Sequence, residues 1–359
     1  MDSLWDFPDF DEHELVQFVT DRESGLRALI AVHSTHLGPA GGGVRFWRYA
    51  HGDAAVVDAL RLSRGMSYKN AMAGLPLGGG KAVILADTER TKTPEMLAAF
   101  GRAVEKLGGQ YVTAEDVGMT VADLVAISKQ TRHIAGLPVA EGEVGGDPGP
   151  HTSYGVYLGV RAAAKRALGK DSLAGLHLAI QGAGSVAGGL ARRAAKDGAR
   201  ISIADLDAAR AQALADEVGG TVVSPEAILS LECDILSPNA LGAILSAETI
   251  PELNTSVVAG GANNQLARRE HGRQLAERGI LYAPDYVANA GGLLSVHFER
   301  GELDAEGVVR RVERIGDDLA ALYDRAASEG RPPFRVADAI VAERLAAGRA
   351  ARAPESRPR

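Results

Sequence analysis

Residues 176–187 of the chain read LHLAIQGAGSVA, and this stretch decides the class of fold. Its first six residues form a mainly apolar run, with the length and composition of a buried strand. Gly182 and Gly184 follow at once, and a helical pattern comes after them. A second strand-like run at 200–204 leads directly into Asp205. A strand, a tight turn, a helix and a further strand in this order predict a parallel α/β unit.

The same turn has the small-residue spacing of a dinucleotide-binding fingerprint, with Ala187 at the third small position. The first glycine permits the turn, and the second lets a pyrophosphate approach the backbone amides of the helix N-terminus. Asp205 lies about twenty residues further on, where an acid accepts hydrogen bonds from the adenosine ribose. A tight turn without a ligand is the alternative, but the strand, the helix and the spaced acid together favour a nucleotide. Because Asp205 would repel a 2′-phosphate, we expect NAD rather than NADP.

Three later stretches, at 233–240, 256–264 and 284–292, end in small or polar residues. The first two read as buried strands and the third as a loop of the same kind. Ligands of open α/β sheets bind beyond the carboxyl ends of the strands. We therefore expect these loops to lie at the binding site.

The N-terminal half contains two lysines, Lys69 and Lys81, on either side of a glycine-rich loop. Lys69 lies near the end of a predicted helix that has Asp53 as its N-cap and runs to about Met72. Lys81 follows Gly78–Gly80, and three glycines allow another molecule to approach the backbone closely. A lysine beside such a cleft can bind a carboxylate, or act as a base if its pKa falls. For either lysine alone, a solvated surface position is the alternative.

Local signals in the same half predict further elements. Two β-prone runs within 13–33, separated by a polar turn, indicate a hairpin. A helix is predicted to begin at Pro94, because proline is favoured at the first helical position. Thr120 and Asp123 have the spacing of a capping box and predict the start of another helix.

Composition excludes several classes of protein. The chain has 359 residues, which predicts two domains, and its net charge of −7 argues against a general binder of nucleic acid or anionic membranes. The single cysteine, Cys233, excludes an intramolecular disulfide framework and a cysteine-rich zinc site, and fits a reducing cytoplasm. The nine histidines show no metal-binding HExxH pattern, so we expect no metal. No signal-peptide pattern or bilayer-spanning apolar run is present, so we expect a cytoplasmic protein.

Eight motifs occur in order between residues 37 and 297: Leu37–Gly43, Met66–Asn70, Leu77–Lys81, Thr113–Gly118, Gly146–Pro148, Gly182–Gly184, Ala262–Asn264 and Asn289–Gly292. Together they resemble the leucine/phenylalanine/valine branch of the amino-acid dehydrogenases, relatives of glutamate dehydrogenase. The resemblance implies a two-domain α/β fold and a homo-oligomer assembled through the first domain. It also implies a reversible reaction, in which an L-amino acid, NAD and water give a 2-oxo acid, ammonium and NADH.

The resemblance also implies roles for individual residues. Lys69 matches the residue that binds the substrate carboxylate, and Lys81 matches the catalytic lysine that activates water. Asp116 matches the carboxylate that moves protons to and from the substrate nitrogen. Burial and a second positive charge both favour a neutral lysine, which makes Lys81 chemically reasonable as a base. The other substrate-binding candidates are Gly42, Gly43, Leu37, Ala114, Asn263, Leu293 and Val296. The cofactor-binding candidates are Gly182, Gly184, Ala187, Asp205, Thr152, Ser185, Val186, Asn239, Asn263 and Asn289.

Four of these positions bear on the choice of substrate. Leu37 and Val296 are apolar where glutamate dehydrogenases place a lysine and a serine, so a buried side-chain carboxylate would lack a partner there. Ala114 resembles the aliphatic-specific members, whereas Leu293 is closer to the phenylalanine type. We expect a branched-chain substrate such as leucine or valine, with phenylalanine as the alternative. A non-catalytic NAD-binding sensor is disfavoured by the complete set of two lysines and one aspartate.

The resemblance and the position of the fingerprint predict the domain organisation. Residues 1–147 are expected to form an α/β domain for substrate binding, catalysis and oligomerisation. Residues 148–325 are expected to form a Rossmann NAD-binding domain. The C-terminal helices from about 325 are expected to pack back on the first domain, and 349–359 to form a frayed tail.

Overall fold

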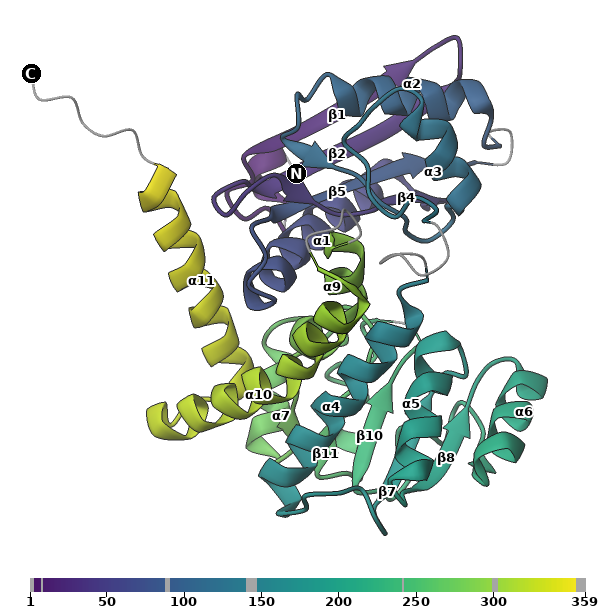
Figure 1. Ribbon diagram of the computed structural model, residues 1–359, viewed down its shortest axis with the longest axis vertical. Coiled ribbons are helices and arrows are strands. Elements are labelled where there is room, and N and C mark those ends of the chain that lie inside the picture. The colour runs from purple at the N-terminus through teal and green to yellow at the C-terminus, as the bar shows by residue number, and fades with distance from the viewer. Residues whose placement is uncertain are drawn as a thin grey trace, which may run out of the picture. The chain divides into compact units, whose positions relative to one another are not determined.

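The computed structural model describes residues 3–7, 9–87, 91–139, 147–240, 242–298 and 303–352. The chain divides into two compact units, Met1–Gly146 with Ile340–Arg359, and Asp147–Ala339 (Figure 1). Each unit contains its own sheet with helices packed against it, so the predicted two-domain α/β class is confirmed. The first unit ends one residue before the domain boundary expected from the sequence.

The first unit contains a six-stranded mixed sheet. Its strands are β1 (Leu15–Asp21), β2 (Leu26–Ser34), β3 (Ala40–Gly41), β4 (Val44–Trp47), β5 (Gly78–Leu85) and β6 (Tyr111–Val112). The order is β1-β2-β5-β3-β6, and β4 also pairs with β5. The antiparallel pair β1–β2 is the predicted hairpin, while β4 runs parallel to β5. The glycine-rich strand β5 is therefore paired along both of its edges.

Three helices belong to this sheet: α1 (Gly52–Met72), α2 (Pro94–Glu105) and α3 (Val121–Ser128), with a short 3-10 turn, η1 (Leu4–Asp6), near the N-terminus. Helix α2 begins at Pro94 as predicted, and the expected capping box of Thr120 and Asp123 starts α3. Asp53, by contrast, is not the N-cap of α1, because the helix starts at Gly52, two residues earlier than expected, and His51 is the N-cap. Asp53 lies instead in the first turn, where a carboxylate still interacts favourably with the helix dipole.

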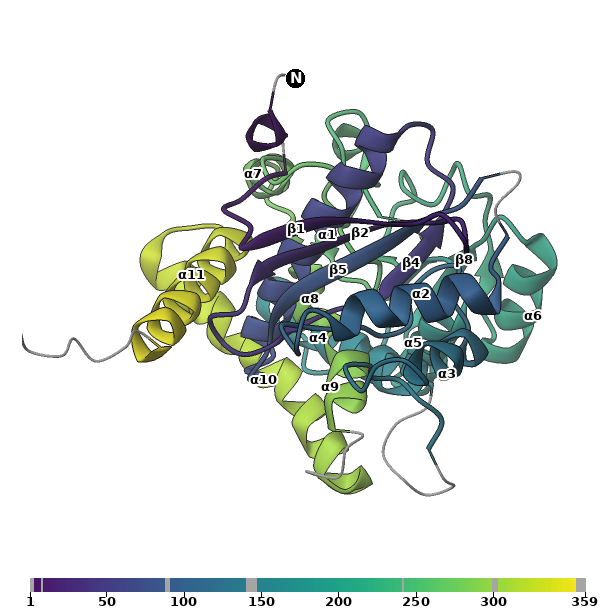
Figure 2. The same cartoon turned by 90° about the horizontal axis from the view of Figure 1, so that it is seen from above.

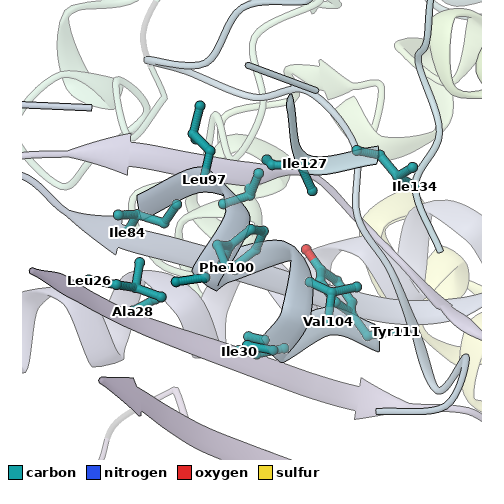
Figure 3. Close-up of a cluster of buried hydrophobic side chains, with 14 of the residues drawn as sticks. Leu26, Ala28, Ile30, Ile84, Leu97, Phe100, Val104, Tyr111, Ile127 and Ile134 are labelled. Carbon is teal, nitrogen blue, oxygen red and sulfur yellow. The ribbon is translucent and has the colours of Figure 1, made fainter. Parts of the chain in front are cut away.

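Both faces of this sheet are covered. Side chains of β2 alternate between a cluster beneath α2 and α3, which includes Leu26 and Ile30, and a cluster beneath α1, which includes Leu29. Figure 2 shows α2 lying across the strands, and Figure 3 shows Phe100 of α2 among the buried side chains of the sheet. The central strands are thus buried on both sides, and a charged residue on β5 must find its partner within the protein.

The second unit contains a parallel sheet of six strands. They are β7 (His177–Gln181), β8 (Arg200–Ala204), β9 (Thr221–Val222), β10 (Ile235–Pro238), β11 (Val257–Val258) and β12 (Leu281–Tyr282), in the order β12-β11-β10-β7-β8-β9. The first strand of the unit, β7, therefore lies in the middle, and the chain turns to the other half of the sheet at β10. This reversal is the topological switch point at which doubly wound sheets bind ligands.

The helices of the second unit confirm the strand–turn–helix prediction, since α5 begins directly after the glycine turn. The helices of this unit are α4 (Gly149–Leu168), α5 (Ser185–Lys196), α6 (Ala208–Val218), α7 (His271–Glu277), α8 (Asp285–Ala288), α9 (Gly291–His297) and α10 (Ala305–Glu329), with a 3-10 turn, η2 (Ile250–Glu252). Helix α4 packs against α5, α9 and α10. Among the described residues, no helix has the length and apolarity needed to cross a membrane.

The last helix, α11 (Pro333–Arg352), contributes to both units. Phe334 near its start is buried in a core cluster of the second unit. Further along, Arg344 donates hydrogen bonds to the carbonyl oxygens of Ala71 and Met72 at the end of α1. The helix continues to Arg352, so the first part of the expected tail at 349–359 is helical, and 353–359 lie outside the described residues.

Candidate active site

Lys81 is a buried lysine in the middle of the first unit's sheet. Its side chain is only 7% exposed, because β5 is paired on both edges and covered on both faces. Its Nζ donates to Oδ2 of Asp116 across 2.7 Å. A buried ammonium is tolerated only when it is paired, so this contact accounts for a lysine at this position. The two residues predicted to carry the chemistry are therefore brought into direct contact.

Asp116 lies in the loop after β6, and the backbone holds this loop beside β4. Val44 donates its N–H to the carbonyl oxygen of Ala114 at 2.8 Å, and Val44 also forms an isolated bridge with Glu115. Burial alone would raise the pKa of the Asp116 carboxyl, but the positive charges of Lys81 and Arg45 outweigh burial and lower that pKa to about 2. Asp116 is consequently a carboxylate at neutral pH.

Arg45 is a third member of this cluster that the sequence reasoning missed. Its Nε donates to the same Oδ2 of Asp116 at 3.0 Å, and its Nη1 donates to Asp58 Oδ2 at 2.8 Å. The hydroxyl of Tyr49 donates to that oxygen of Asp58 at 2.6 Å. The position of Arg45, directly after the glycine run and Val44, was visible in the sequence. Its contact with Asp116 was not visible, because residues 114–117 come to lie beside β4 only in the folded sheet.

The glycines before Lys81 serve internal packing. A Cβ atom added to Gly79 would stand 2.1 Å from the backbone nitrogen of Ser67 on α1. One added to Gly80 would stand 2.6 Å from Cδ2 of Tyr111. The faces of these glycines are filled by the protein itself, so the expectation that they admit another molecule is wrong. What they do is let α1, with Lys69 in its last turn, lie directly against the strand that carries Lys81.

The other candidates of the first unit surround the same strands. A Cβ on Gly42 would meet the carbonyl oxygen of Gly80, and one on Gly43 would meet that of Glu115, so both glycines are needed for chain packing. Leu37 and Ala114 are each half-buried. Their contact with a substrate remains a prediction.

In the second unit, the glycine turn has the geometry of a nucleotide cradle. Gly182 has a φ of +99°, which only glycine adopts readily, and Gly184 is the N-cap of α5 without any side-chain capping bond. A Cβ on Gly184 would meet nothing within 4 Å. The Asp205 carboxylate accepts the N–H of Ala183 at 2.7 Å and so fixes the turn. The open space above an uncapped helix N-terminus fits a pyrophosphate, which the first residues of α5, Ser185, Val186 and Ala187, would face.

Asn289 and Asn263 form a second polar group in this unit. Asn289 Nδ2 donates to Asn263 Oδ1 at 2.8 Å and to the Gly261 carbonyl oxygen at 3.1 Å. Within the described part of the chain, Oδ1 of Asn289 is buried and has no hydrogen-bond partner. An orphaned buried acceptor is costly and fits the amide of a bound nicotinamide.

The remaining predicted residues lie around these groups. Asn239 accepts the N–H of Gly261 at 2.8 Å and donates to the carbonyl oxygen of Ser237, so it joins the ends of β10 and β11. Thr152, in the first turn of α4, donates to the Pro148 carbonyl oxygen; Gly146 of the same motif lies outside the described residues. Leu293 and Val296 are three residues apart on α9 and both are half-buried.

A parallel sheet with a topological switch point in one unit and a buried lysine paired with a carboxylate in the other are typical of a two-domain dehydrogenase. The family comparison is more specific. Residues 13–133 match the Glu/Leu/Phe/Val dehydrogenase dimerisation domain, and residues 203–352 match the Glutamate/Leucine/Phenylalanine/Valine dehydrogenase domain. The chain belongs to this family, and the resemblance seen in the motifs is confirmed.

Individual relatives cover nearly the whole chain. A leucine dehydrogenase of Thermoactinomyces intermedius is 46% identical over 95% of this chain and 93% of its own length. A valine dehydrogenase of Streptomyces albus is 46% identical over 95% of this chain and 94% of its own. The solved structure of an L-tryptophan dehydrogenase from Nostoc punctiforme superposes with a TM-score of 0.80 and 40% identity, covering 94% of this chain and 97% of that one.

Proposed function

We propose that the protein catalyses the reversible, NAD-dependent oxidative deamination of a branched-chain L-amino acid. The products are the 2-oxo acid, ammonium and NADH. The observation that carries this proposal is the buried Lys81–Asp116 pair, in a chain 46% identical to a leucine dehydrogenase. Paired ionisable groups of this kind are typical of proton-transfer sites, and a sensor that only binds NAD does not require them.

The residues of the first unit divide the chemistry between them. Lys69, in the last turn of α1, binds the substrate carboxylate as a point charge. Lys81, once it has lost its proton, activates the water that attacks the imino acid. Asp116 receives and returns protons at the substrate nitrogen. Because Lys81 and Asp116 share a hydrogen bond, they act as one unit in proton transfer.

The second unit holds the cofactor. Gly182, Gly184 and the start of α5 would take the pyrophosphate, and Asp205 would take the adenosine ribose. Asn263 and Asn289 would hold the nicotinamide side. When bound, NAD accepts the hydride from the substrate α-carbon, and the protein orients the two.

The substrate preference follows from the apolar candidates. Leu37, Ala114, Leu293 and Val296 offer no charge to a side-chain carboxylate, so glutamate is disfavoured. Leu293 is the one feature that favours phenylalanine, which remains the second candidate. We further propose a cytoplasmic homo-oligomer, supported by the match to a dimerisation domain and by the single cysteine.

The test is NADH formation by the purified protein across a panel of L-amino acids at alkaline pH, with NADP in a parallel series. We expect kcat/KM to be highest for leucine or valine, lower for phenylalanine and lowest for glutamate, with NAD preferred over NADP. Turnover with glutamate alone would contradict the substrate argument, and no turnover with any amino acid would contradict the proposed function.

A further inference from the structure

Arg45 joins the Asp116 carboxylate to helix α1. Its guanidinium donates from Nε to Asp116 and from Nη1 to Asp58, and the side chain is only 22% exposed. The rigid fork of the arginine guanidinium holds two carboxylates in a fixed orientation, whereas a lysine ammonium rotates freely and imposes no such orientation. Burial alone would lower the pKa of Arg45, but the two acids outweigh burial and raise that pKa, so Arg45 stays charged.

The contact on Asp116 is made at a single oxygen. Arg45 Nε and Lys81 Nζ both donate to Oδ2 of Asp116, at 3.0 and 2.7 Å. Two donors on one oxygen fix the position of that oxygen. With Arg45 removed, Asp116 can rotate about its side-chain bonds while still meeting the flexible lysine.

The outer end of this link lies on the helix that carries Lys69. Asp58 and Lys69 are eleven residues apart on α1, about three turns, so their side chains lie on the same side of the helix. Asp58 is itself held by Tyr49, whose hydroxyl donates to the same oxygen as Arg45. The chain of contacts therefore runs from α1 through Arg45 to Asp116 and on to Lys81.

We propose that Arg45 is a positioning residue that fixes the Asp116 carboxylate beside Lys81 and balances the charge of the pair. The inference rests on the proposed function, since it assigns a role in the same reaction. Arg45 touches no substrate atom in this account and acts only through Asp116.

The charges around Asp116 predict the direction in which each substitution should shift the pH profile of activity. The groups around Asp116 are Lys81 on β5, Arg45 on β4 and the neutral hydroxyl of Tyr111; behind Arg45 lie Asp58 and the neutral hydroxyl of Tyr49. Removing Arg45 leaves two carboxylates against one lysine, so the limb on which kcat/KM rises with pH should move to higher pH. Removing the charge of Asp58 should shift this limb to lower pH, because one negative charge near Lys81 disappears.

The experiment measures the pH profile of kcat/KM for the purified protein and three variants, with the amino acid and NAD turned over by the wild type. We expect Arg45→Met to lower kcat about 10–100-fold and to move the activating limb up by about 1–2 pH units. We expect Asp58→Asn to move the same limb down by a few tenths of a unit. Arg45→Lys should keep the wild-type midpoint of this limb, because the positive charge is retained, but it should have a lower kcat than the wild type. Arg102→Gln is the matched control, since Arg102 forms an exposed ion pair with Asp21 in the same unit and should change neither quantity.

Opposite shifts in Arg45→Met and Asp58→Asn support the inference, because a purely structural role would lower activity without moving the limb in two directions. An unshifted limb in a folded Arg45→Met variant overturns it. If that variant does not fold, Asp58→Asn decides alone, and an unchanged or raised midpoint overturns the inference. Absence of turnover in the wild type would instead contradict the proposed function.

Discussion

Gly79 is the position at which a single methyl group should move α1 away from the catalytic strand. In Gly79→Ala the new Cβ would stand 2.1 Å from the Ser67 nitrogen, 2.3 Å from Ser67 Oγ and 2.5 Å from the Ser63 carbonyl oxygen. Ordinary contacts begin at 3.4 Å, so the backbone of α1 must retreat by about 1 Å. Overpacking of this kind costs about 1–3 kcal/mol, and more when backbone must move. For a domain of this size the cost corresponds to a fall in Tm of about 2–12 °C.

The same retreat should affect substrate binding, because Ser67 lies two residues before Lys69. We therefore expect Gly79→Ala to raise KM for the amino acid by more than it raises KM for NAD, whose candidate residues lie in the other unit. Thermal unfolding and steady-state kinetics measure the two effects. Gly52→Ala is the matched control, since a Cβ there meets nothing within 4 Å and alanine favours the helix. A Gly79→Ala variant with wild-type Tm and wild-type KM would refute the packing argument.

Two further changes test the rest of the structure. Burial, with His33 adding to it, lowers the pKa of His13 from 6.5 to about 4, so its contribution to stability is complete above pH 6.5 and is lost as the pH falls towards 4. Between these pH values the free energy of unfolding, measured by urea denaturation, should fall by about 2 kcal/mol less in His13→Gln than in the wild type. An equal fall in the two proteins would contradict this. Asp205→Ser should raise kcat/KM with NADP relative to NAD at least about tenfold, because the charge that repels a 2′-phosphate is removed. An unchanged cofactor ratio would show that another residue makes the choice.

Most of the architecture followed from local sequence signals. The strand–turn–helix at 176–187, the β1–β2 hairpin and the start of α2 at Pro94 each depend on residues close together in the chain. Such features are set by backbone preferences and by the period of apolar residues. The N-cap of α1 was misassigned because an aspartate is also favourable two positions after the N-cap, in the first turn, where Asp53 lies.

What the sequence did not reveal depends on contacts between distant segments. The partners of Arg45 are 13 and 71 residues away. Asp116 reaches it because residues 114–117 lie beside β4 in the folded sheet. The glycines before Lys81 looked like an opening for a ligand, but they are filled by α1 and by Tyr111, far away in the chain. A run of glycines indicates that another group lies close to the backbone, but it does not indicate whether that group is a ligand or part of the protein itself.

The removal of Lys81 tests the central claim most directly. Turnover of the best amino acid by Lys81→Ala should be compared with the wild type, and NAD binding to both proteins should be measured by calorimetry. Our account predicts that turnover falls by at least about a thousandfold, because the proposed base is lost, while NAD still binds with an affinity close to that of the wild type. A Lys81→Ala enzyme that retains more than a tenth of wild-type turnover would contradict it.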